Sequence, residues 1–187
     1  MLRSGLALAG ANTWLRAGKP PEEAEDGLLT AEDVTGLDLV DTELVVLSAC
    51  ETGLGAVHVG EGVFGLRRAF IVAGAKTLVM SLWKVPDLAT AFLMDRFYDN
   101  LLDRGLDRDL ALSDAQRATR EVTVGELRVA WLSGASIDRL AVGDPAARRA
   151  LEKLANRPDG HRPFEHPFYW GAFICQGDTA PLRPGPG

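Results

Sequence analysis

Cys50 is a candidate nucleophile of this 187-residue chain, because a thiolate can attack a carbonyl carbon. It follows the run 44–49, which carries one hydroxyl and no charge. A short apolar run of this kind predicts a strand over 44–50, buried on both faces of a parallel sheet. Such a strand brings Cys50 to its carboxyl end, where α/β sheets bind ligands. The turn at Gly53–Gly55 then lets the backbone fold closely around the thiol. The position suits a nucleophile, and it suits equally a small buried apolar residue.

Five segments, in order along nearly the whole chain, resemble the motifs of one family. They are Ser4–Asn12, Leu47–Gly53, Gly60–Phe70, Ser81–Asp87 and His166–Phe173. Together they are similar to the CHAT domain, a caspase-like cysteine peptidase relative often found after tetratricopeptide repeats in bacteria. The resemblance implies an α/β fold, a caspase-like three-layer sandwich with a mostly parallel sheet. It also implies a cysteine endopeptidase with Cys50 as nucleophile, no cofactor, and a protein or peptide substrate.

A cysteine hydrolase also needs a general base, and the histidines of this chain fit that role poorly. In caspase-type enzymes the histidine lies about 50 residues before the cysteine. In CHAT domains it sits in an Ala-Thr-His-Gly-like motif before the segment that resembles 4–12, so the resemblance implies an N-terminally truncated domain without its first strands. His58 is a weak substitute, with a solvated loop residue as the alternative. We expect His161 to be exposed and His166 to have a packing or hydrogen-bonding role.

The isolated chain is therefore expected to be a weak or inactive peptidase. A neighbouring polypeptide or a tetratricopeptide-repeat region would supply the missing part. Asp87, after the second predicted strand, is a candidate to bind a basic substrate side chain; Glu51 and Glu61 are weaker candidates. The alternative for Asp87 is a carboxylate stabilised by the dipole at a helix N-terminus, and both interpretations can hold.

Two other functions stay open from the sequence. The first is a non-catalytic CHAT-like scaffold or protein-binding module, favoured because the strand at 44–49 would lack its neighbour and present an apolar edge. The segment 6–9 is an alternative cover for that edge. The second is a dinucleotide-binding Rossmann-like protein, because Gly60–Gly65 spells GxGxxG and Asp87 follows 22 residues later. Its context is wrong, since about ten residues separate the strand from the motif, whereas the fingerprint follows its strand directly.

Composition narrows the class of protein. With 47% hydrophobic residues and no long unbroken apolar run, the chain is expected to be one soluble domain over 1–187, with a surface loop at 18–27 and a flexible tail at 183–187. A formal charge of −6 argues against binding nucleic acid or an anionic membrane. Two cysteines make no disulfide framework, and no spacing suggests a metal site. A reducing cytoplasm is the expected compartment.

Local patterns predict the elements that position Cys50. Thr30 followed by Asp33 predicts a capped helix to about Leu37. Helical spacing over 63–73, ended by Gly74, is followed by a strand over 77–83, which indicates parallel pairing with the cysteine strand. Further predicted elements are a brief strand within 1–12, helices over 86–102, 110–124 and 145–155, and a last strand over 169–176 that buries Cys175 as an inert thiol.

Overall fold

The computed structural model describes residues 5–8, 11, 27–48 and 61–182. They form two compact units. The first unit runs to Lys84 and includes Ile174–Thr179, and the second contains Val85–Phe173 and the residues from Ala180 onward. Helices and strands occur together in an α/β arrangement, which confirms the predicted fold class.

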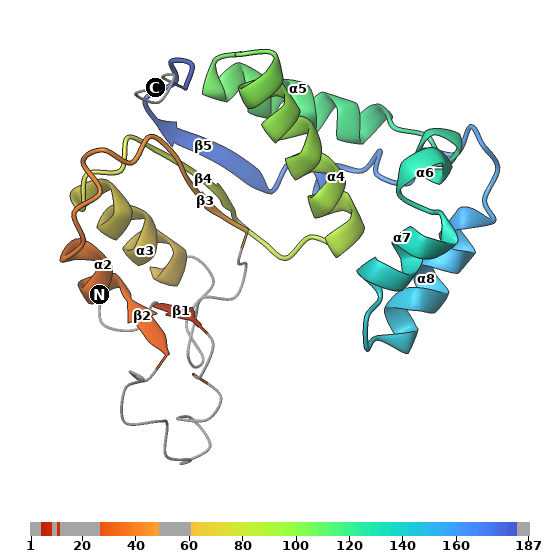
Figure 1. The fold of residues 1–187 in the computed structure, drawn as a ribbon, viewed down its shortest axis with the longest axis horizontal. Helices are drawn as coiled ribbons and strands as arrows, with labels where there is room; N and C mark the ends of the chain where they lie inside the picture. The colour runs from red at the N-terminus through yellow and green to blue at the C-terminus, as the bar shows by residue number, and fades with distance from the viewer. Residues whose placement is uncertain (1–4, 9–10, 12–26, 49–60, 183–187) are drawn as a thin grey trace. The chain divides into compact units, whose positions relative to one another are not determined.

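The sheet of the first unit is built on a parallel strand pair. β3 (Val45–Leu47) pairs with β4 (Thr77–Ser81) in a register that sets Val46 beside Val79. Helix α3 (Glu61–Val72) occupies the connection between them, as parallel pairing requires. This confirms the predicted strand–helix–strand unit (Figure 1).

β5 (Phe173–Gly177) lies on the other side of β4, which gives the strand order β3-β4-β5. The amide of Asp178 donates to the Lys76 carbonyl at 2.9 Å, so the end of β5 lies beside the start of β4. β5 therefore runs opposite to β4, and the sheet is mixed. The last strand begins four residues later than predicted, because Pro167–Tyr169 form a turn of 3₁₀ helix.

The prediction that the cysteine strand is buried on both faces is wrong for its described residues. Val45, Val46 and Leu47 are each half-buried, whereas all five residues of β4 are buried. The reason is its position, since among the described strands only β4 pairs with β3. Val45 and Leu47 still pack against the core formed by α2 and α3.

The expected strand near the N-terminus is present but has a different partner. β1 (Gly5–Ala7) pairs antiparallel with β2 (Leu28–Thr30) rather than with β3. α2 (Ala31–Thr35) follows β2 directly, and its predicted capping box is confirmed. The amide of Asp33 donates to Thr30 Oγ1, while the Thr30 amide donates to the Asp33 carboxylate.

The end of α3 confirms the predicted glycine cap. Gly74 has φ of +105°, and its amide donates to the Ile71 carbonyl. The Ala75 amide donates to the Phe70 carbonyl, which completes a Schellman motif. The segment before β3 closes over this turn, because the Leu39 amide donates to the Ala73 carbonyl at 2.8 Å.

The second unit is helical. α4 (Asp87–Tyr98) continues into a π-helical turn at Asp99–Asp103, which together match the helix predicted to about Leu102. α8 (Pro145–Ala155) has the predicted bounds. The helix predicted over 110–124 is confirmed as α5 (Arg108–Glu121), but it ends three residues earlier than predicted, because Thr123 starts a new helix. The helices of this unit not yet named are α6 (Val124–Ala130) and α7 (Gly134–Leu140).

Among the described helices, none is both long and apolar enough to cross a membrane.

Candidate functional site

The described part of the cysteine strand stops at Ser48, just after the carboxyl end of β3. Leu47 pairs with Met80, so the next residues along the two strands are Ser48 and Ser81. Ser48 is exposed and Ser81 is buried. Because the strands are parallel, both carboxyl ends lie at one edge of the sheet. Cys50, two residues beyond Ser48, is outside the described residues.

Helix α3 returns to the same edge. It connects two parallel strands, so its axis runs back against them and its N-terminal end lies at their carboxyl edge. In Figure 1 the start of α3 lies toward the end of β3. Leu66, Ala69 and Phe70 join the core against which β3 packs, and this fixes α3 relative to the strand. A helix N-terminus carries a partial positive charge that favours an anion such as a thiolate.

The other residues predicted for the site fall into two groups. Glu51 and His58, like Cys50, lie outside the described residues. Asp87 is exposed in the first turn of α4, after the N-cap Pro86. This is the environment of the alternative interpretation, a carboxylate at the positive end of a helix dipole.

The bounds of β3, α3 and β4 test whether the GxGxxG motif at Gly60–Gly65 stands in the context of a dinucleotide site. The fingerprint requires an acidic residue at the end of the second strand. β4 ends at Ser81, and Asp87 lies in the next helix. Between the end of β3 at Leu47 and the start of α3 at Glu61 lie 48–60, so the motif does not follow its strand directly. Both observations disfavour a dinucleotide site.

The two described histidines, His161 and His166, belong to the second unit. His161 is exposed, as predicted. His166 is the N-cap of the 3₁₀ turn, and its Nδ1 accepts a hydrogen bond from the Phe168 amide at 3.2 Å. This confirms the predicted hydrogen-bonding role of His166.

Cys175 lies within the last strand, as predicted, but it is not fully buried. Its side chain is half-buried, because β5 has β4 as its only neighbour among the described strands. Partial exposure makes this thiol a useful internal reference for the reactivity of Cys50.

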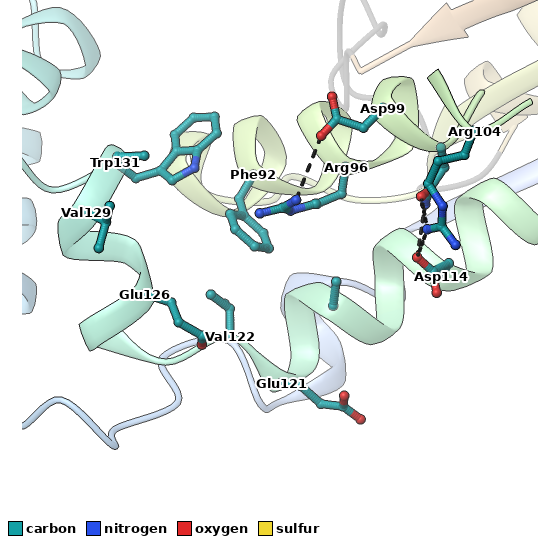
Figure 2. A pocket seen from close by; sticks show the side chains of 13 residues that line it. Phe92, Arg96, Asp99, Arg104, Asp114, Glu121, Val122, Glu126, Val129 and Trp131 are labelled. Carbon is teal, nitrogen blue, oxygen red and sulfur yellow. Dashed lines mark hydrogen bonds and ion pairs between the residues drawn. The ribbon is translucent and has the colours of Figure 1, made fainter. Parts of the chain in front are cut away.

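A cavity of about 550 Å³ in the second unit is a feature that sequence reasoning missed (Figure 2). Its apolar wall contains Phe92 and Trp131, which meet edge to face with ring centroids 6.1 Å apart. Arg96 lies over the Phe92 ring at 5.4 Å and forms an ion pair with Asp99 at 3.8 Å. The place for a cation on this aromatic face is therefore taken by the protein itself.

The remaining charges of this cavity also have partners within the protein. Arg104 bonds the side chain of buried Asn100 at 2.6 Å and pairs with Asp114 at 3.2 Å. Burial opposes the effect, but hydrogen bonds from Arg117 and Asn100 hold the pKa of Asp114 below its ordinary value. This network joins the π-helical turn to α5. We therefore interpret it as a structural feature rather than a ligand site.

Two further carboxylates line the same cavity. The Thr123 amide and hydroxyl bond Glu126 and lower its pKa, as the capping box at the start of α6 requires. A hydrogen bond from Arg120 lowers the pKa of Glu121. The signal for α6 was present in the sequence, since a threonine followed three residues later by glutamate is a helix-start pattern.

Comparison with known proteins gives the family. The CHAT domain family model matches residues 1–178. Human Tetratricopeptide repeat protein 28 is 40% identical over 93 residues, and the mouse protein of that name is 38% identical over 93 residues. Each match covers 50% of this chain and 4% of the length of the relative. No solved structure gives a significant match. Because the family model matches most of its length, this chain belongs to the CHAT domain family.

Proposed function

We propose that this chain carries the nucleophile of a caspase-like cysteine endopeptidase, and that the nucleophile is Cys50. The observation that carries the proposal is the parallel pairing of β3 with β4 through α3. Ser48 follows β3 at the edge where α/β proteins bind ligands, and the CHAT family model, which matches residues 1–178, includes Cys50.

The chemistry assigned to this edge is acyl transfer. The Cys50 thiolate attacks the scissile carbonyl carbon, and the tetrahedral oxyanion accepts hydrogen bonds from backbone amides near the cysteine. Collapse of this intermediate breaks the C–N bond, and the leaving amine takes a proton from the general acid. Water then hydrolyses the thioester and releases the second product. The N-terminus of α3 favours the thiolate form.

The proton acceptor is assigned to a histidine outside these 187 residues. His161 and His166 are exposed residues of the second unit, and His166 already accepts the Phe168 amide. His58 remains a weaker candidate. A tetratricopeptide-repeat region is one proposed source of the missing part, because both named relatives are tetratricopeptide repeat proteins. The chain alone is then a weak or inactive peptidase, and Cys50-dependent peptide hydrolysis by the purified chain contradicts this assignment.

The assignment of the nucleophile is tested with a peptidyl acyloxymethyl ketone, which alkylates an activated cysteine. We expect labelling of the wild-type chain and of Cys175→Ser, and none of Cys50→Ser. Labelling that survives in Cys50→Ser, or that is lost in Cys175→Ser, refutes the assignment. Both variants keep the size of the side chain and remove one thiol, so each is the control of the other.

Selection of a basic substrate side chain is assigned to Asp87 and Glu51. The test compares acyloxymethyl ketones that place arginine or alanine before the reactive group. We expect Asp87→Asn to slow the arginine reagent and leave the alanine reagent unchanged. Equal effects on both reagents leave the helix-dipole interpretation of Asp87 as the correct one.

The alternative is a non-catalytic binding module, and one observation favours it. β3 is an edge strand of the described sheet, and edge strands offer backbone groups to a partner strand. Light scattering of the purified chain separates the cases. A concentration-dependent dimer whose β3 amides become protected from hydrogen exchange supports strand pairing at β3. A monomer in which these amides stay unprotected supports a β3 edge that takes no partner strand from a second copy.

A further inference from the structure

A second groove in the second unit combines an apolar floor with a basic rim. Its volume is about 410 Å³, within the range of ligand-binding pockets. Its floor contains Leu88 from α4, Leu151 from α8 and Phe164 from the loop after α8, all buried. The Tyr169 ring packs against Phe164 with centroids 5.4 Å apart and continues the apolar wall.

The rim of this groove carries basic side chains. Lys153, Arg157 and His161 line it and are exposed, and no acidic residue is among the lining residues that the structure describes. The protein as a whole carries a net charge of −6, so this local excess of cations runs against the overall composition.

Two carboxylates that neighbour these cations in the sequence are paired with other residues. Glu152, next to Lys153 in the chain, pairs with Arg148 at 3.8 Å. Asp159 pairs with Arg128. In the described part of the chain, neither the Lys153 ammonium nor the Arg157 guanidinium has an ion-pair partner, in contrast to the charges of the first cavity.

We propose that this groove docks an acidic peptide segment of a partner protein, with a large aliphatic side chain seated on the apolar floor. The aliphatic side chain of the peptide leaves water when it packs on this floor. Carboxylates on either side of it meet Lys153 and Arg157. Such rim charges attract and orient an acidic partner, and their effect weakens with salt.

The test uses the full 187-residue chain and a short fluorescent peptide in which a leucine pair is flanked on each side by two aspartates. Fluorescence anisotropy reports binding. We expect an otherwise identical peptide with asparagines to bind at least about tenfold more weakly, and a peptide with serines in place of the leucines to lose affinity as well. Added salt should weaken the binding of the aspartate peptide but not the binding of the asparagine peptide.

Charge reversals on the protein locate the site. Lys153→Glu and Arg157→Glu should each lower the affinity for the aspartate peptide by about fivefold or more. Arg149→Glu is the matched control, because Arg149 is exposed on the same helix as Lys153, its replacement makes the same change of charge as Arg157→Glu, and it does not line the groove. It should change affinity by less than about twofold. All three side chains are exposed, and circular dichroism checks that the variants fold.

Three results overturn the proposal: no binding of the aspartate peptide, equal binding of the asparagine peptide, or an equal loss in Arg149→Glu. Vesicles of phosphatidylserine and phosphatidylcholine form a separate arm. Binding to these vesicles that depends on Lys153 and Arg157, without binding of the peptide, identifies an anionic membrane as the ligand and refutes a peptide site.

Discussion

Replacing Gly74 by alanine is expected to destabilise the first unit by about 2–3 kcal/mol. Gly74 has φ of +105°, and left-handed conformations cost a residue with a Cβ about 1–2 kcal/mol. The added Cβ lies 2.9 Å from the Val40 amide nitrogen, so the backbone there must move. That movement disturbs the hydrogen bond from the Leu39 amide to the Ala73 carbonyl, which contributes about 1 kcal/mol.

Hydrogen exchange followed by mass spectrometry is the suitable assay, because the two units need not unfold together. Peptides that cover α3 and β4 report the first unit. Gly36→Ala is the matched control, since Gly36 also ends a helix of the first unit but has φ of −83°. Its Cβ would meet the Asp33 carbonyl oxygen at 3.3 Å, and we expect a change within about 0.5 kcal/mol. If Gly74→Ala is no more destabilising than Gly36→Ala, the backbone argument fails.

Three further predictions concern the second unit. Asn100→Ala should lower the unfolding free energy of the second unit by about 1–3 kcal/mol, because the Ala111 carbonyl and the Asp114 carboxylate lose a buried donor. Chemical denaturation measures this loss of stability. An unchanged denaturation midpoint counts against a stabilising role of the Asn100 hydrogen bonds. Thr123→Ala should cost about 1 kcal/mol through loss of the α6 cap, and Thr123→Ser should restore most of it. The pKa values of Asp114 and Glu126 are lowered, so their stabilisation is complete above about pH 5 and is lost as pH falls through the folded-state pKa values. An unfolding midpoint that stays constant from about pH 5 to pH 2 contradicts this.

Features encoded by local signals were predictable from the sequence. The capping box at Thr30 and the glycine that ends α3 each act within a few residues. The parallel pairing of β3 and β4 was also predictable, because a helix fills the connection between them. In all these cases the signal and the structure lie in the same segment.

Features that depend on tertiary context were missed. The half-burial of β3 and of Cys175 follows from the single described strand that flanks each of the two strands, which an apolar run does not reveal. The cavity network joins Asn100, Arg104 and Asp114 from separate elements, and no spacing in the sequence marks it. The capping-box pattern of Thr123 and Glu126 marks the break before α6, but the helical spacing over 110–124 favoured one continuous helix.

For the candidate site, sequence and structure contribute different parts. The sequence singles out Cys50 through its motif, and the structure provides the β3–α3–β4 unit that leads to it. The position of Asp87 in the first turn of α4 is established, whereas its role toward a substrate remains a proposal.

The central claim is that Cys50 is the activated thiol of this chain. The direct measurement is the rate of iodoacetamide modification of each cysteine in the native protein, followed by mass spectrometry across a range of pH. We predict that Cys50 reacts first, with an apparent pKa below the value of about 8.5 of a free cysteine. Faster modification of the half-buried Cys175, or a Cys50 that reacts only after denaturation, would contradict the account.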